Sequence, residues 1–334
     1  MDKILAIIET KENGYKKSSL EIVTIGIKLS DYINAEIDFL VINSETDEII
    51  KDIQNYGAGN VLILSLNELN SLSNVKQILF SHSAIAKAIS NIIHQNNYNI
   101  ILLSATSLGL EIAPKIAVQT DSAYMSNCTE IIPDEGNLKI KKQIFSSKID
   151  AFYSINQKRT IISIRPNSYT PEINKSQNTN FKKIDVKSLE ITENDFTDIV
   201  KEFIPNTGKT DLTEANIIVS GGLGMQKAEN FFLISELAEV LNGSVGASRA
   251  VVDNGWRPHS EQIGQTGKTV APLLYIACGI SGSLQHLAGI SKSKYIIAIN
   301  NDKNAPIFKI ADYGIVGDAM EILPVLIKEI KKNK

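Results

Sequence analysis

The sequence predicts an α/β protein with two domains: an N-terminal parallel-sheet domain that ends in a strand meander, and a C-terminal doubly wound domain. Three observations predict this architecture. A length of 334 residues suits two domains better than one. Short apolar runs alternate with amphipathic stretches, and the pattern begins again at Ala215 after a polar interval. Apolar runs that lack a polar alternation are typical of parallel strands covered on both faces.

The first domain is expected over residues 1–166. Its predicted parallel strands are residues 4–8, 37–42, 61–64 and 100–103. Helical patterns separate them, one with Leu20, Val23 and Ile27 and another with Ile85, Ala88, Ile89 and Ile92. Strand-like segments follow around Ile131, Ile140, Phe152 and Ile161, with a hairpin turn at residues 134–137. The domain is therefore expected to end in a meander.

Residues 167–213 are polar and aperiodic, so they are expected to connect the domains, with one short strand or helix within 186–203. The second domain is expected over residues 214–334. Its predicted strands are 217–219, 273–278 and 295–299. Its predicted helices are 231–241, closed by Asn242-Gly243, a helix opened by Ser281, and a helix that begins at Asp318. Ligands of such sheets bind beyond the carboxyl ends of the strands.

Composition excludes several classes of function. A net charge of −3 gives no electrostatic reason to expect nucleic acid. The longest apolar runs have only the length of strands, so membrane insertion is not expected. No targeting peptide is evident, so a cytoplasmic location is expected and secretion is not. Cys128 and Cys278 are far apart in sequence, which is not the spacing of a metal site or a disulfide framework.

Three glycine-rich turns lie between residues 246 and 289. They carry polar side chains on Ser248, Arg249, Gln265, Thr266, Ser281, Ser283, Gln285 and His286. Glycine lets the backbone approach a ligand closely, and these side chains suit a large anionic molecule with a polar ring. No acid–base pair or nucleophile–base pair is evident in the stretch. This pattern favours the binding of a cofactor over the cleavage of a bond.

Neither common nucleotide fingerprint is present in this stretch. Gly267-Lys268-Thr269 would end a phosphate-binding loop, but that motif requires glycine where Gln262 stands. Gly222-Leu223-Gly224 would begin the GxGxxG fingerprint, yet Lys227 occupies the third glycine position.

The second-domain motifs resemble those of the electron transfer flavoprotein alpha subunit. The matching segments are 248–256 (SRAVVDNGW), 262–268 (QIGQTGK), 279–289 (GISGSLQHLAG) and 311–318 (ADYGIVGD). Weaker matches at 56–58 and 104–109 extend the resemblance over nearly the whole chain. The resemblance implies FAD bound mainly by a Rossmann-like second domain, and a heterodimer with the beta subunit. It also implies electron traffic with acyl-CoA dehydrogenase or a similar flavoenzyme.

The resemblance also assigns expected roles to residues. Arg249 is expected against the flavin ring, Thr266 near N5, and His286 near the C2 carbonyl as an imidazolium or an N–H donor. Asn300 and Asp318 are expected to serve the adenosine half. The full set of implied cofactor-binding residues is Ser248, Arg249, Gln262, Ile263, Gly264, Gln265, Thr266, Gly267, Ser281, Gly282, Ser283, Leu284, Gln285, His286, Asn300, Asp318 and Ala319.

Structural roles remain open for several of these side chains. Arg249 could form a surface ion pair, His286 could be a core histidine, and Asp318 could cap a helix. Trp256 is expected to pack beside the site rather than to relay electrons. Leu223 departs from the pattern of the family that the chain resembles, because many relatives carry arginine in that turn. Either Lys268 or backbone N–H groups would then do more for the phosphates, or FAD would be held less tightly. Leu110 likewise stands where relatives often carry arginine.

Two other functions compete with this interpretation. A flavin- or NAD-dependent oxidoreductase with its own small-molecule substrate would need an acid–base pair, which the glycine-rich stretch lacks. A non-redox module that binds ATP or AMP in the first domain would need a phosphate loop, which that domain lacks. Within the favoured family, the sequence leaves open whether the chain works in a bifurcating system with NADH, and whether its partner holds AMP or a second FAD.

Overall fold

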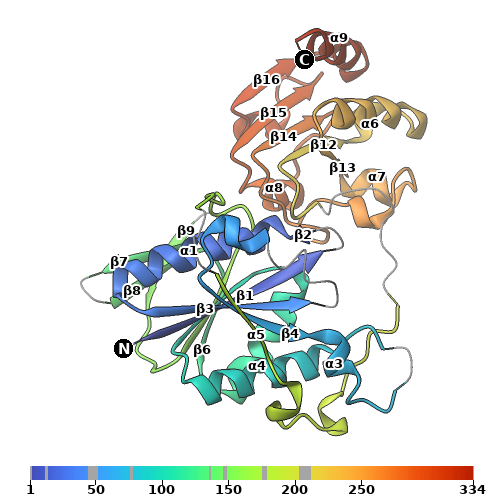
Figure 1. Cartoon of the computed structure of the whole chain (residues 1–334). Coiled ribbons are helices and arrows are strands. Elements are labelled where there is room, and N and C mark those ends of the chain that lie inside the picture. The colour runs from blue at the N-terminus through green and yellow to red at the C-terminus, as the bar shows by residue number, and fades with distance from the viewer. Residues whose placement is uncertain are drawn as a thin grey trace. The chain divides into compact units, whose positions relative to one another are not determined.

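The computed structural model describes residues 2–11, 14–43, 52–75, 78–134, 137–145, 149–174, 179–202 and 212–333 (Figure 1). Contacts divide the chain into two units, the first formed by Met1–Ile144 and Asp150–Pro205 and the second by Phe145–Ile149 and Asn206–Lys334. Each unit has its own sheets and its own hydrophobic clusters.

Over its described residues, the first unit has an eight-stranded sheet in the order β11-β4-β3-β1-β5-β10-β6, with β2 paired to β1. The pairs along this order are parallel, and β2 pairs antiparallel. The strands are β1 Lys3–Lys11, β2 Gly14–Tyr15, β3 Glu36–Asn43, β4 Asn60–Ser65, β5 Ile100–Ser104, β6 Ala123–Cys128, β10 Thr160–Ile164 and β11 Asn180–Lys183. The helices are α1 Lys17–Ile33, α3 Leu66–Asn70, α4 His82–Asn96 and α5 Ser107–Gln119, with a 3₁₀ turn η1 at Asp52–Tyr56.

Strand β1 explains why its sequence shows no polar alternation. Leu5 and Ile7 belong to the cluster that α4 and α5 cover, whereas Ile4 and Ile8 belong to the cluster that α1 covers. All four side chains are buried. Figure 1 shows α1 on one side of the sheet and α4 and α5 on the other. The predicted parallel sheet, covered on both faces, is therefore confirmed.

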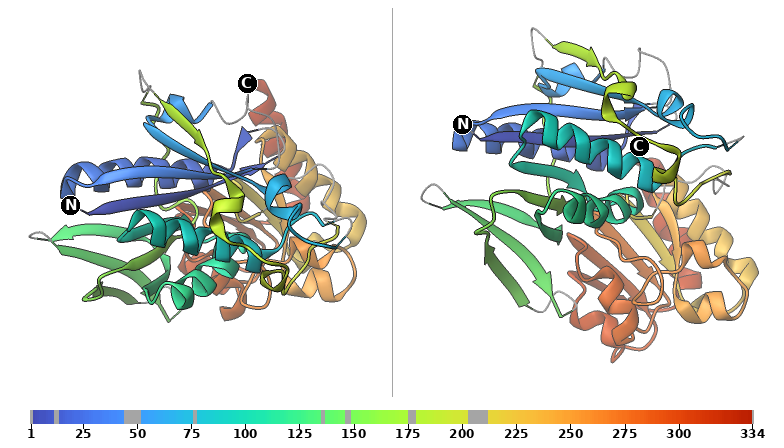
Figure 2. Two further views of the ribbon diagram at one scale, coloured as in Figure 1. Left: turned by 60° about the horizontal axis from the view of Figure 1, so that its bottom comes forward. Right: turned by 90° about the horizontal axis from the view of Figure 1, so that it is seen from below.

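A second sheet of the first unit has the order β7-β8-β9, with strands β7 Glu130–Asp134, β8 Asn137–Ile144 and β9 Ile149–Ser154 (Figure 2). Asp134 pairs with Asn137, so the predicted hairpin is present, while residues 135 and 136 of its turn lie outside the described residues. The segment at Ile161 was expected in the meander, but it forms β10 and lies between β5 and β6 in the main sheet.

The polar stretch expected to connect the domains contributes to the first unit. Residues 180–183 form β11, which pairs with β4 at the edge of the main sheet. Two 3₁₀ turns follow, η2 at Val186–Leu189 and η3 at Glu193–Asp195. Leu189 and Phe196 are buried against α4, α5 and their neighbours. Residues 203–211 lie outside the described residues.

The second unit has a parallel sheet in the order β13-β12-β14-β15-β16 over its described residues. The strands are β12 Ile217–Gly221, β13 Ser244–Ala247, β14 Leu274–Cys278, β15 Tyr295–Asn300 and β16 Tyr313–Val316. The helices are α6 Phe231–Val240, α7 Arg249–Asp253, α8 Leu284–Ile290 and α9 Ala319–Lys332. The 3₁₀ turns are η4 Leu223–Met225, η5 Ala228–Asn230, η6 His259–Glu261 and η7 Pro306–Lys309. The predicted doubly wound fold is confirmed.

The sequence correctly predicts the start of one helix in the second unit and misplaces the start of another. The carboxylate of Asp318 accepts a hydrogen bond from the Met320 amide at 2.8 Å, so the expected start of α9 is confirmed. Helix α8 is capped by Ser283, not by Ser281 as expected. Within the described residues, no helix is both long enough and apolar enough to cross a membrane.

Candidate functional site

The order of strands in the second unit marks where a ligand would bind. The chain leaves β12 toward β13 on one side and later returns to β14 on the other side. Such a reversal opens a crevice beyond the carboxyl ends of the two central strands. Here these ends are Gly221 of β12 and Cys278 of β14, which are paired in the sheet.

Glycines hold the two turns beyond these strands against each other. The Gly222 amide donates to the Cys278 carbonyl at 2.9 Å, and the Gly224 amide donates to the Gly279 carbonyl at 3.0 Å. A Cβ on Gly222 would lie 2.2 Å from the Gly279 oxygen, and a Cβ on Gly279, whose φ is 61°, would lie 2.7 Å from the Gly224 backbone. A side chain at either position would push the turns apart, so glycine is required for this floor of the crevice.

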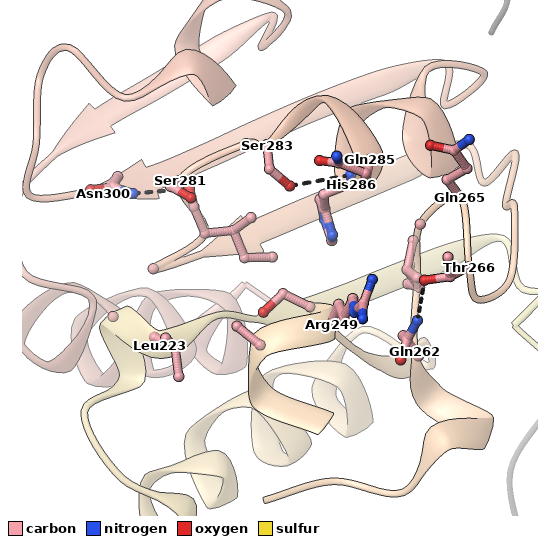
Figure 3. A pocket seen from close by; sticks show the side chains of 18 of the residues that line it. Leu223, Arg249, Gln262, Gln265, Thr266, Ser281, Ser283, Gln285, His286 and Asn300 are labelled. Atoms are coloured by element: carbon pink, nitrogen blue, oxygen red, sulfur yellow. Dashed lines mark hydrogen bonds between the residues drawn. The ribbon is translucent and has the colours of Figure 1, made fainter. Parts of the chain in front are cut away.

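Above this floor the described residues of the second unit enclose a cavity of about 650 Å³ (Figure 3). That volume lies within the range of sites for small molecules and cofactors. The cavity is lined by Leu223, Gly224, Ser248, Arg249, Ala250, Gln262, Ile263, Gly264, Gln265, Thr266, Gly279, Ile280, Ser281, Gly282, Ser283, Gln285, His286, Asn300 and Asn301. Among the described residues that line the cavity, Arg249 is the one with a permanent charge, and none is a carboxylate.

Most of the residues expected from the sequence line the cavity. The expected residues that the lining does not include are Gly267, Leu284, Asp318 and Ala319. The lining residues that the sequence analysis did not name as cofactor-binding are Leu223, Gly224, Ala250, Gly279, Ile280 and Asn301. Gly224 and Gly279 could have been found from the glycines that follow two predicted strands.

Arg249 begins α7, directly after the turn that leaves β13. Its Nε lies 3.2 Å from the Asp253 carboxylate, and its side chain is 62% exposed. An exposed pair of this kind contributes at most about 1 kcal/mol, so a ligand can recruit the guanidinium at little cost. Figure 3 shows the guanidinium and the His286 ring on opposite sides of the cavity.

His286 projects from the first turn of α8 and is buried, with 4% of its surface exposed. Its Nε2 lies 3.0 Å from the hydroxyl of Tyr275, and its Nδ1 is buried. Burial lowers the pKa of His286 to about 4, and the Ile263 carbonyl opposes this shift only in part. The ring is therefore neutral near pH 7, so of the two expected forms the structure favours the N–H donor over the imidazolium.

The turn that follows residue 261 is closed by its own hydrogen bonds. The Gln262 side-chain amide donates to the Thr266 hydroxyl at 3.0 Å, and the Lys268 amide donates to the Gln262 carbonyl at 2.8 Å. A Cβ on Gly267 would lie 2.4 Å from that same carbonyl oxygen. Gly267 therefore permits the tight turn that presents Thr266 and Gln265, which explains why it is absent from the lining.

Asn300 and Asp318 hold neighbouring segments in place. The Asn300 side chain donates to the Ile280 carbonyl at 2.9 Å and lines the cavity. Asp318 caps α9 and accepts a hydrogen bond from the Gln226 side chain at 3.2 Å, and it does not line the cavity. The helix-cap role considered for Asp318 is therefore the one that the structure displays.

The structure also places Trp256 and the two leucines, Leu223 and Leu110, that stand where relatives often carry arginine. Trp256 packs edge-on against Phe231, with ring centroids 6.3 Å apart, and it does not line the cavity. Leu223 does line the cavity and is 47% exposed. Leu110 is 44% exposed on α5 of the first unit.

The residues fit a flavin dinucleotide. The cavity offers glycine backbone for close approach, hydroxyl and amide groups, one cation and a neutral imidazole. Among the described residues, no group of side chains could hold a metal ion.

Known proteins resemble both halves of the chain. Residues 211–291 match the model of the electron transfer flavoprotein FAD-binding domain, and residues 4–189 match the electron transfer flavoprotein domain. The electron transfer flavoprotein subunit alpha of Thermoanaerobacterium thermosaccharolyticum is 40% identical, with 99% of each chain covered. Protein FixB of Clostridium saccharobutylicum is 36% identical, over 97% of this chain and 95% of the relative. The acryloyl-CoA reductase electron transfer subunit beta of Anaerotignum propionicum is 31% identical, over 99% of this chain and 96% of the relative. The chain therefore belongs to the electron transfer flavoprotein alpha subunit family and carries that family's FAD-binding domain.

Proposed function

We propose that the chain is the alpha subunit of a heterodimeric electron transfer flavoprotein, in which it binds FAD and carries electrons between two redox proteins. The observation that carries this proposal is the composition of the cavity. The lining holds one fixed cation, Arg249, and a neutral buried histidine, and it holds no carboxylate that could act as a general base. A site of this kind can hold and tune a redox cofactor, but it lacks the groups that transform a small-molecule substrate.

Bound FAD would supply the redox chemistry, and the residues of the chain would set how readily it accepts electrons. The Arg249 guanidinium would favour the reduced, negatively charged ring from one side of the cavity. The neutral His286 ring would meet the cofactor on the other side, while Thr266 and Gln265 would be presented by the turn closed at Gly267. Glycine backbone at the crevice floor would approach the diphosphate, since the described lining contains no cation besides Arg249.

The partners belong to the proposal as well. We expect the beta subunit to complete the heterodimer, and we expect an acyl-CoA dehydrogenase or a similar flavoenzyme to exchange electrons with it. Support comes from the relative in Anaerotignum propionicum, whose name assigns it to an acryloyl-CoA reductase as an electron transfer subunit. A cytoplasmic location and a role in fatty acid β-oxidation follow from the same proposal.

The division of labour within the chain is proposed from the sequence. Residues 1–166 would pack on the beta subunit, and residues 214–334 would hold FAD and reorient between donor and acceptor. Residues 167–213 would connect the two, although their described part as far as residue 202 belongs to the first unit. Crosslinking of cysteine pairs placed on the two units, in oxidised and reduced protein, tests the reorientation. A single crosslinking pattern in both redox states would contradict it.

Co-expression with the beta subunit, followed by anaerobic reduction, tests the function. The purified heterodimer should show flavin bands, and an acyl-CoA dehydrogenase with its acyl-CoA substrate should bleach them, whereas acyl-CoA alone should not. Bleaching by a small-molecule substrate other than NADH, without any partner enzyme, would contradict the carrier role. Cofactor analysis of the same sample separates FAD plus AMP from two FAD, and NADH as the reductant tests the bifurcating form.

A further inference from the structure

Arg257 lies outside the cavity but contacts the supports of two of its walls. It comes just before the 3₁₀ turn η6, and its side chain contacts both Phe231 and Glu261. The guanidinium grips the Glu261 carboxylate with two hydrogen bonds: Nε donates to Oε2 at 2.6 Å, and Nη2 donates to Oε1 at 2.7 Å. None of these three residues belongs to the described lining of the cavity.

The pair of Arg257 and Glu261 has a fixed geometry. Two parallel N–H···O bonds between a guanidinium and a carboxylate set both the distance and the angle between the groups. The Arg257 side chain is 21% exposed and that of Glu261 is 10% exposed, so solvent screens the pair only in part. Without the guanidinium, the carboxylate would lose two hydrogen bonds and stay largely buried, which is unfavourable. The pair therefore holds residue 261 in one place.

Glu261 is followed directly by the turn that presents Thr266 to the cavity. Gln262 forms a bridge with Ala247, the last residue of β13, and its side chain donates to the Thr266 hydroxyl at 3.0 Å. Its carbonyl accepts from the Lys268 amide at 2.8 Å, which closes the turn. Gln262 and Thr266 both line the cavity. A shift of residue 261 would therefore be passed on to the wall of the cavity.

Arg257 is also fixed from below the floor of the crevice. Its guanidinium carbon lies 5.7 Å from the centre of the Phe231 ring, within the range of a cation–π contact. Phe231 is buried, and a Cβ on Gly221, the last residue of β12, would lie 2.5 Å from its ring. Arg257 therefore links the floor of the crevice to the turn that begins after Glu261.

We propose that Arg257 is a positioning residue that anchors the turn of residues 262–268, so that this wall of the cavity is ordered before FAD arrives. The proposal rests on the proposed function, because it names a residue that sets the affinity of the same site. A turn that is in place in only a fraction of the molecules weakens ligand binding by that fraction. Arg257 raises this fraction without touching the cofactor.

Hydrogen exchange on the cofactor-free full-length protein tests the anchoring without FAD. Arg257→Gln removes both the charge and the paired hydrogen bonds. We expect the peptide that covers residues 262–268 to exchange roughly tenfold faster, while β14 and β15 keep their rates, because the change is local. Unchanged exchange in residues 262–268 would overturn the proposal. An equal acceleration over the whole second unit would overturn it too, since Arg257 would then serve general stability.

A double-mutant cycle measures whether the pair itself sets FAD affinity. If about one molecule in ten keeps the turn in place, Arg257→Gln should bind FAD roughly tenfold more weakly. Its flavin should also differ in midpoint potential, which a residue of general stability would not alter. The losses in Arg257→Gln and Glu261→Gln should not add in the double variant, because both break the same pair. Additive losses would overturn the proposal.

Two further variants complete the series. Arg257→Lys keeps the charge but cannot form the two parallel hydrogen bonds, so it should recover only part of the affinity lost in Arg257→Gln. Full recovery would show that charge alone is needed and would overturn the positioning role. The matched control is Lys332→Gln, which breaks an exposed pair with Glu329 on α9, outside the described lining. It should match the unmodified protein in exchange and in FAD binding.

The outcomes separate this proposal from the proposed function. If residues 262–268 loosen in Arg257→Gln but the unmodified protein takes up no FAD, the proposed function fails and the anchoring of the turn stands. If the unmodified protein binds FAD and Arg257→Gln changes neither the affinity nor the midpoint potential, the proposed function stands and the proposal for Arg257 fails.

Discussion

Replacing Arg249 with alanine should lower the midpoint potential of the bound flavin. A unit charge about 4 Å from the ring contributes roughly 4 kcal/mol at an effective dielectric near 20 and roughly 1 kcal/mol in water. For one electron these energies correspond to about 170 mV and about 40 mV. Because the Arg249 side chain is 62% exposed and faces Asp253 at 3.2 Å, we expect a decrease nearer the lower figure.

Potentiometric titration of the FAD-loaded heterodimer measures this decrease. Asp253→Asn supplies a control of opposite sign, because it removes the negative charge that offsets Arg249 and should raise the potential. Both side chains are exposed on the short helix α7, so neither substitution should unfold the second unit. If Arg249→Ala retains FAD and its potentials equal those of the unmodified protein, the cation is not beside the ring and the assignment of the site is wrong.

Three further predictions concern the fold and the cavity. Glu21 is buried on α1 and its pKa is raised to about 7 by burial, so the folded state holds a proton that the unfolded state loses above pH 4.5. The free energy of unfolding of the first unit should therefore fall by roughly 3 kcal/mol between about pH 4.5 and pH 7. Glu21→Gln should flatten this pH dependence in urea unfolding. A free energy of unfolding that rises over this interval would contradict the prediction. Gly279→Ala should destabilise the second unit by about 2–3 kcal/mol. Gly255 also has a positive φ but has open space around it, so Gly255→Ala should cost about 1 kcal/mol. Equal losses in thermal unfolding would show that the turns after β12 and β14 do not interlock. Leu223→Arg should tighten FAD binding several-fold and make it more sensitive to salt, and a fluorescence titration that shows neither effect would remove Leu223 from the phosphate side of the cavity.

The sequence could predict the elements whose own residues carry the signal. Continuous apolar runs such as the one in β1 indicate a doubly covered strand, and Asp318 before an amphipathic run indicates a helix start. Strand β11 could not be predicted, because its polar residues become a strand only by pairing with β4. Strand β13 consists of Ser-Val-Gly-Ala. Four residues with mostly small side chains show no alternation of apolar and polar positions, so the sequence does not reveal this strand.

The site divides in the same way. Its glycines, hydroxyls and Arg249 were predicted, because they lie in compact motifs. The sequence could not show that Gly267 serves a turn, since that depends on a carbonyl oxygen 2.4 Å from its missing Cβ. It could not show the pairing of His286 with Tyr275 either, because that contact joins α8 to a neighbouring strand.

Titration of FAD into the cofactor-free heterodimer tests the central claim most directly. The account predicts one FAD per alpha chain in the cavity beyond β12 and β14, with a yellow complex that Gly279→Ala weakens and Gly255→Ala does not. A heterodimer that takes up no FAD, or one that binds it equally well when Gly279 carries a side chain, would contradict the account.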